Sequence, residues 1–149
     1  MEQSMVEKFI VTRSVDLDAA PAEVWDLVGR FGALDRWHPL VATCVVEMID
    51  EVEHRRFATL DGAEFLERLA ARHPHAKRYD YGVVSSPLPL SGYASSLRVA
   101  ARDLGARVVW SSQFDSDEPR VEAMVEAVYD AGLAALRERY GALTPALGA

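Results

Sequence analysis

The sequence predicts an α+β fold in which an antiparallel sheet packs against one long helix near the C-terminal end. Segments with strand-like alternation follow one another from Val41 to Phe114 with short links, and strands joined in this way form antiparallel sheets. From about Ser116 to Tyr140 the pattern becomes that of an amphipathic helix, whose apolar face must lie against the sheet. The chain shows no internal repeat or linker, so we expect one domain, residues 1–149.

The N-terminal part combines a strand with two short helices. Residues 6–17 alternate as a strand does, and one row contains Phe9, Val11, Arg13, Val15 and Leu17. Pro21 suits the first turn of a helix, and apolar residues at helical spacing continue it to Phe31. A second short helix is predicted over residues 34–37, before Pro39.

Six further strands are predicted before the long helix. They cover residues 41–51, 54–60, 63–73, 77–84, 92–102 and 107–114. The pair Asp61-Gly62 signals a tight turn. A loop rich in proline and serine precedes Gly92. The predicted order is therefore one strand, two helices, six strands and one long helix.

Charge and composition exclude several classes of protein. The formal net charge of −7 disfavours a nucleic acid or an anionic membrane surface as partner, and short basic clusters such as His54-Arg55-Arg56 are interpreted as solvated strand ends. No stretch approaches the roughly 18 apolar residues of a membrane span. The single cysteine, Cys44, fits a cytoplasmic location.

The sequence contains no motif for a metal or a cofactor. His73 and His75 lie at a turn without an obvious third ligand, so no metal site is predicted. Phosphate-binding glycine loops and nucleophile elbows are absent from the sequence, so we expect no cofactor. The sequence leaves the oligomeric state open between a monomer and a homodimer.

One carboxylate lies on the inward row of the strand at residues 63–73. That row reads Ala63, Phe65, Glu67, Leu69 and Ala71. An acid among apolar neighbours is costly unless it is solvated or paired. A pocket with a polar guest or a water cluster would solvate Glu67, and the alternative is a side chain that tilts to the strand edge and meets an arginine.

Three segments carry a resemblance to a known family: DLDAAPAEVWDLVGRFGALDRWHPLV, RYDYGVVSSPLPLSGYASSLRV and RVVWSSQF. With them the chain resembles the START-like superfamily, also called SRPBCC or Bet v 1-like, and within it the bacterial polyketide cyclase/dehydrase and lipid-transport family. The resemblance implies a helix-grip fold. In that fold a curved seven-stranded sheet wraps a C-terminal helix and leaves a largely apolar cavity for a hydrophobic small molecule.

A more distant likeness is to the plant abscisic acid receptors. Glu67-Arg68-Leu69 matches their Glu-Arg-Leu, which implies a ligand-facing position for Glu67. The same likeness implies pocket-facing positions for Tyr81, Val83, Tyr93 and Ser95. Ala42 replaces the lysine that pairs with the hormone's carboxylate, and residues 58–62 replace the gate loop. A hormone receptor is therefore not expected.

Alternation and resemblance agree on most of the candidate ligand-binding residues. They are Trp37, Tyr79, Tyr81, Val83, Tyr93 and Ser95, with Arg13 from the first strand. Tyrosine rings and hydroxyls suit a flat, partly oxygenated guest, or they fill the core with their hydroxyls at its rim. Arg13 is placed to pair with Glu67, to hold an anionic group of the guest, or to reach solvent at the sheet edge.

Two aromatic positions allow different interpretations. We interpret His38, at the end of the short helix that closes one mouth of the cavity, as a cap or surface residue, and the alternative is a base. In the last strand Trp110 shares an apolar row with Val108 and Phe114, whereas the plant-receptor alignment turns Ser111 inward. The sequence does not decide which row of that strand faces inward.

The sequence supports three functional hypotheses. In the first, the domain binds a hydrophobic, aromatic or polyketide-like molecule and, as the resemblance implies, catalyses its cyclisation or dehydration. Glu67, with its pKa raised by burial, would then act as general acid or base, and Tyr81 would stabilise an enolate oxygen. In the second, the domain is a non-catalytic carrier or sensor of a hydrophobic small molecule. In the third, the interior is filled and binds no guest.

Overall fold

A computed structural model describes residues 5–143. Its elements are β1 (Glu7–Leu17), α1 (Pro21–Val28), η1 (Phe31–Arg36, a 3₁₀ helix), β2 (Val41–Ile49), β3 (Val52–Thr59), β4 (Glu64–His73), β5 (Arg78–Ser85), β6 (Ser91–Arg102), β7 (Gly105–Ser116) and α2 (Arg120–Tyr140). All seven strands belong to one antiparallel sheet with the order β1-β7-β6-β5-β4-β3-β2.

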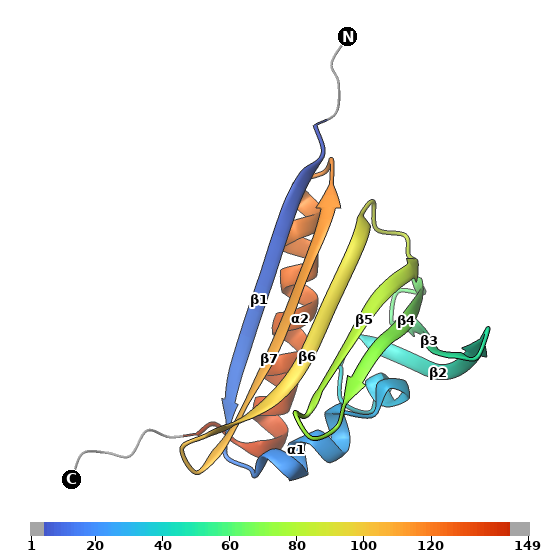
Figure 1. Cartoon of the computed structure of the whole chain (residues 1–149). Coiled ribbons are helices and arrows are strands. Elements are labelled where there is room, and N and C mark those ends of the chain that lie inside the picture. The colour runs from blue at the N-terminus through green and yellow to red at the C-terminus, as the bar shows by residue number, and fades with distance from the viewer. Residues whose placement is uncertain (1–4, 144–149) are drawn as a thin grey trace.

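The sheet curves around α2, which lies along β1 and β7, while α1 and η1 lie at one end of the sheet (Figure 1). This arrangement is the helix-grip fold that the sequence predicts. The fold class, the order of the elements and the seven strands are confirmed. The curvature places the concave face of the sheet opposite the apolar face of α2.

Most element boundaries differ from the prediction by a few residues, and the backbone accounts for two of these differences. The helix α1 ends at Val28 rather than Phe31, and a Cβ at Gly29 would lie 2.6 Å from the Trp25 ring, so the chain leaves the helix at a residue without a side chain. The strand β2 ends at Ile49 because Asp50 and Glu51 adopt φ of 52° and 65°. Two residues with positive φ form the tight hairpin turn that twisted strands favour.

The apolar face of α2 carries one glycine at a crowded position. Val125, Tyr129 and Leu133 are buried against the sheet. A Cβ at Gly132 would lie 2.7 Å from the His38 ring and 3.0 Å from the Trp110 ring. The glycine weakens the helix by about 1 kcal/mol relative to alanine, and it lets these two rings approach the helix backbone.

Candidate functional site

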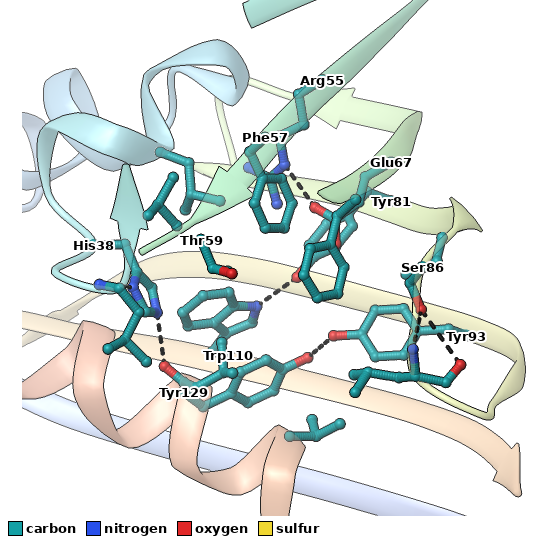
Figure 2. Close-up of a pocket in the computed structure, with 18 of the residues that line it drawn as sticks. His38, Arg55, Phe57, Thr59, Glu67, Tyr81, Ser86, Tyr93, Trp110 and Tyr129 are labelled. Atoms are coloured by element: carbon teal, nitrogen blue, oxygen red, sulfur yellow. Dashed lines mark hydrogen bonds and ion pairs between the residues drawn. The ribbon is translucent and has the colours of Figure 1, made fainter. Parts of the chain in front are cut away.

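A cavity of about 90 Å³ lies between the concave face of the sheet and α2 (Figure 2). Aliphatic and aromatic side chains from η1, β2–β7, the β5–β6 loop and α2 form most of its wall. An apolar cavity of about 150 Å³ accommodates benzene. Since this cavity is smaller than that, even a guest of one ring requires the side chains around it to move apart.

The polar end of the cavity is a buried ion pair between neighbouring strands. Arg55 of β3 lies opposite Glu67 of β4 in the sheet register, across the hairpin that turns at Asp61-Gly62. The Arg55 Nε donates a hydrogen bond to the Glu67 Oε1 at 2.7 Å, and the two side chains are 1% and 7% exposed. Each charge depends on the other, because a single unpaired charge at this depth would be far more costly to bury.

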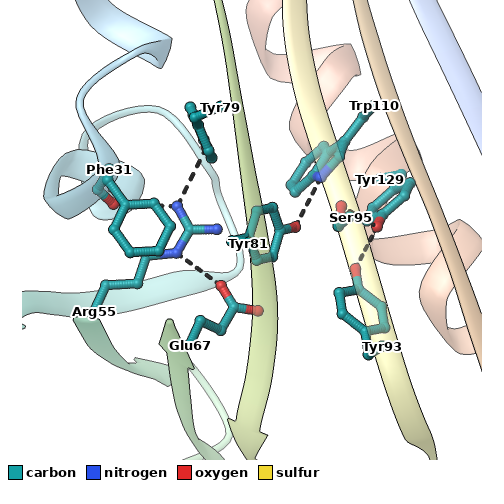
Figure 3. A network of polar contacts seen from close by, with 9 residues as sticks. All are labelled: Phe31, Arg55, Glu67, Tyr79, Tyr81, Tyr93, Ser95, Trp110 and Tyr129. Atoms are coloured by element: carbon teal, nitrogen blue, oxygen red, sulfur yellow. Dashed lines mark hydrogen bonds and ion pairs between the residues drawn. The ribbon is translucent and has the colours of Figure 1, made fainter. Parts of the chain in front are cut away.

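Aromatic rings enclose the guanidinium of Arg55. Its Cζ lies 4.2 Å from the centroid of the Phe31 ring and 4.6 Å from that of Tyr81 (Figure 3). Its Nη1 donates to the Phe31 carbonyl at 3.1 Å and to the Tyr79 hydroxyl at 3.3 Å. The buried Nη2 has no hydrogen-bond partner within residues 5–143.

Burial and pairing have opposing effects on the two charged groups. Burial raises the pKa of Glu67, and the Arg55 guanidinium only partly opposes that rise. Burial alone would lower the pKa of Arg55, but the Glu67 carboxylate and the nearby tyrosines outweigh it and hold that pKa above its usual value. Arg55 therefore stays protonated. Glu67 releases its proton at a higher pH than an exposed carboxyl does.

Tyr81 has a hydroxyl proton for which residues 5–143 provide no acceptor. The Trp110 Nε1 donates to the Tyr81 hydroxyl at 2.9 Å, and because an indole nitrogen only donates, the Tyr81 oxygen is the acceptor there. No other hydrogen bond of this hydroxyl occurs among the described residues. Burial raises the pKa of Tyr81 well above its usual value, so the hydroxyl stays protonated.

A second group of hydroxyls uses all its protons within the protein. Ser95 donates to the Ser111 carbonyl at 2.9 Å, so its oxygen accepts from Tyr129 at 3.1 Å. Tyr129, with its proton used, accepts in turn from the Tyr93 hydroxyl. The chain runs Tyr93 to Tyr129 to Ser95 and ends on a backbone carbonyl, which fixes the direction of every proton in it.

His38 is buried in the cavity wall, so its interpretation as a surface residue is wrong, whereas a contact with the backbone just after η1 is present. Its Nδ1 accepts from the Leu40 N–H at 3.2 Å, and its Nε2 lies 2.8 Å from the Val128 carbonyl. The first bond requires an unprotonated Nδ1, so the Nε2 carries the proton. Burial lowers the pKa of His38 and keeps the ring neutral. Gly132 is the sequence feature that makes room for it.

Four of the predicted site residues line the cavity: Glu67, Tyr81, Val83 and Tyr93. Three others are buried nearby but do not line it. Trp37 packs against the Trp110 ring at 5.6 Å, Tyr79 bonds Arg55 from the side away from the cavity, and Ser95 turns toward the β7 backbone.

Arg13 lies on the helix-facing row of β1 but outside the cavity wall. It pairs with Glu126 and Asp130 of α2, and its side chain is 36% exposed. The pairing of Arg13 with Glu67 that the sequence allowed is therefore wrong. The strand β1 lies at the edge of the sheet opposite β2, and three strands separate it from β4, which carries Glu67.

The sequence-based interpretation missed Arg55, which is buried rather than a solvated strand end. A signal for it was present, because Arg55 and Phe57 share a row and the Asp61-Gly62 turn sets Arg55 opposite Glu67. Trp110 faces inward and Ser111 bonds Thr12 on the outer face, which resolves the open row of β7. Tyr129 on α2 was also missed, and no local pattern distinguishes it from a core residue.

Two general features of the described chain bear on the site. No helix within residues 5–143 is both long enough and apolar enough to cross a membrane. Within the same residues, no cluster of three or more His, Cys, Asp or Glu side chains is arranged to hold a metal ion.

Comparisons with known proteins agree with this architecture. The model of a family described as polyketide cyclase / dehydrase and lipid transport matches residues 8–141. The protein XoxI from Bacillus cereus is 27% identical with a TM-score of 0.80, over 88% of this chain and 94% of that one. A protein from Thermobifida fusca is 35% identical with a TM-score of 0.78, over 89% of this chain and 93% of that one.

A third similar structure is the di-domain ARO/CYC BexL from the BE-7585A biosynthetic pathway. It is 16% identical with a TM-score of 0.73, over 92% of this chain and 51% of that one, and this likeness shows the fold alone. No functionally curated protein matches the sequence significantly.

Proposed function

Because the chain belongs to the polyketide cyclase/dehydrase and lipid-transport family, within the SRPBCC (Bet v 1-like) superfamily, we propose that its cavity binds a hydrophobic, aromatic or polyketide-like small molecule and catalyses its cyclisation or dehydration. The observation that carries the proposal is a buried carboxyl, Glu67, beside a hydroxyl with an uncommitted proton, Tyr81, in an otherwise mostly apolar cavity. A titratable group whose pKa is shifted by burial and that lies in a cleft is a candidate for a functional site.

In this mechanism Glu67 is the general base. Its Oε1 is held by Arg55, and its Oε2, which accepts no hydrogen bond from the described residues, takes a proton from a carbon next to a ketone of the guest. The C–H electron pair moves onto the ketone oxygen, and the Tyr81 hydroxyl donates a hydrogen bond to that enolate. The enolate carbon bonds to a second carbonyl carbon, and protonated Glu67 returns its proton to the new alkoxide. Loss of that hydroxyl with a second proton releases water.

A carrier or sensor without catalysis is the second candidate function. It is favoured by the hydrogen bonding of the titratable groups, because both nitrogens of His38 and one oxygen of Glu67 are already engaged inside the protein. The same cavity would hold a guest without any proton transfer. The two candidates differ only in whether the Glu67 proton moves.

The test uses 2,6-heptanedione, a diketone whose internal aldol reaction and loss of water give a cyclic enone with a strong ultraviolet absorbance. Wild-type protein should accelerate enone formation, and Glu67→Gln should lower that rate by about 10²–10⁴-fold with binding nearly unchanged. Glu64→Gln, an exposed carboxylate on the outer face of the same strand, is the matched control and should keep full activity. Full activity in Glu67→Gln would rule out the acid–base role, and binding without turnover in the wild type would support the carrier.

A further inference from the structure

We infer that the polar end of the cavity is a recognition site for a neutral carbonyl oxygen, which accepts hydrogen bonds from the Arg55 Nη2 and the Tyr81 hydroxyl, and that this end discriminates against carboxylates. The inference rests on the proposed function, because it requires a small molecule in the cavity. Beyond that function, the inference says that the protein holds the guest by a carbonyl oxygen and that the guest carries no negative charge at that end.

Within residues 5–143, the hydrogen bonds of the cavity wall leave these two donors uncommitted. Thr59 donates to Asp61 and Ser86 donates to the Leu88 carbonyl. Tyr93 donates to Tyr129, which in turn donates to Ser95. Both nitrogens of His38 are also bonded. Among the described residues that line the cavity, the protons without an acceptor are therefore those of the Arg55 Nη2 and the Tyr81 hydroxyl.

The side chains that carry the two donors are neighbours in the cavity wall. Tyr81 stacks against the guanidinium with its ring centroid 4.6 Å from the Arg55 Cζ, and both side chains line the cavity. Figure 3 shows the outer edge of the guanidinium turned toward the Tyr81 ring, with the Tyr81 hydroxyl on the side of that ring where Trp110 lies. A buried donor without an acceptor is costly, and a guest oxygen placed there would relieve that cost.

The charge balance at this end selects against an anion. Arg55 is the only positively charged side chain among the described residues that line the cavity, and its ion pair with Glu67 already neutralises it. A carboxylate guest would place a second negative charge on the same guanidinium, next to a carboxylate that is 7% exposed. A ketone accepts both hydrogen bonds and brings no charge. A hydrocarbon leaves both donors unsatisfied.

The experiment compares three guests of nearly equal shape, acetophenone, benzoate and ethylbenzene, by isothermal titration calorimetry with the whole chain near pH 7. Acetophenone should bind at least about tenfold more tightly than ethylbenzene, since hydrogen bonds to a charged donor and a neutral donor both contribute. Benzoate should bind more weakly than acetophenone. The carbonyl stretching band of bound acetophenone should move to lower frequency, which reports the hydrogen bonds directly in the wild type.

A matched pair of variants identifies the donor. Tyr81→Phe should remove most of the preference for acetophenone and reduce the shift of the carbonyl band, with ethylbenzene binding little changed. Tyr79→Phe is the control, because its hydroxyl also bonds Arg55 but lies outside the cavity wall, and it should keep both the preference and the shift.

The outcomes separate this inference from the proposed function. Equal affinities for acetophenone and ethylbenzene, an unshifted carbonyl band, or tighter binding of benzoate would overturn the carbonyl site while small-molecule binding stands. Binding of none of the three guests would overturn the proposed function together with it.

Discussion

Replacing Arg55 with methionine leaves Glu67 as an unpaired carboxylate whose side chain is 7% exposed. Removing one partner of a buried ion pair costs about 3–5 kcal/mol. Methionine retains apolar contact with the rings of Phe31 and Tyr81, but the attraction of the guanidinium for them is lost, at about 0.5–2 kcal/mol. Proton uptake by Glu67 limits the summed loss of stability, because a neutral carboxylic acid is less costly to bury than a carboxylate. We expect a loss of about 3–5 kcal/mol in the free energy of unfolding at neutral pH.

The loss should depend on pH with a definite sign. Without Arg55 nothing opposes the burial that raises the pKa of Glu67, so the folded state binds a proton more tightly than the unfolded state. The stability that depends on the protonated acid is present at low pH and is lost as pH rises through the raised pKa. Arg55→Met should therefore be less damaging at about pH 5 than at about pH 7.

Urea denaturation, followed by tryptophan fluorescence and circular dichroism, measures these differences. The double variant Arg55→Met/Glu67→Leu removes both charges and should recover most of the stability lost in the single variant. Arg72→Met breaks a pair with Glu53 at 3.0 Å, where the side chains are 38% and 25% exposed, and should cost about 0–1 kcal/mol. A loss in Arg55→Met no larger than in Arg72→Met would refute the reasoning, since Glu67 would then have reached solvent.

Two further predictions concern the packing of α2 and the buried histidine. Gly132→Ala should lower the thermal unfolding temperature, because a Cβ 2.7 Å from His38 and 3.0 Å from Trp110 overpacks the core by about 1–3 kcal/mol against a helix gain of about 1 kcal/mol. A higher unfolding temperature would show that the rings move aside. Burial lowers the pKa of His38 below its usual 6.5, so the stability that neutral His38 provides is present above that pH and lost as pH falls through the lowered pKa. Relative to His75→Asn at an exposed turn, His38→Asn should flatten the decline in unfolding free energy below about pH 6.5, and an unchanged decline would contradict this.

The sequence by itself determined the elements, their order and most of the inward rows. Alternation placed Tyr79, Tyr81 and Val83 on one face and Glu67 on the inward side of its strand, and the structure has them there. These features depend on spacing between residues that are close in the chain. Turn chemistry at Asp61-Gly62 is equally local, and it contained enough information to pair Arg55 with Glu67.

Only the tertiary structure decided which side chains meet across the cavity. The stacking of Phe31 on Arg55, the contact of Tyr129 with Tyr93 and the burial of His38 against α2 join segments distant in the sequence. They depend on how strongly the sheet curves and on where the helix crosses it, which are set by the packing of the whole core rather than by any local pattern. Local periodicity predicts which face of a strand or helix a side chain lies on. It does not predict which residues of other elements pack against that face.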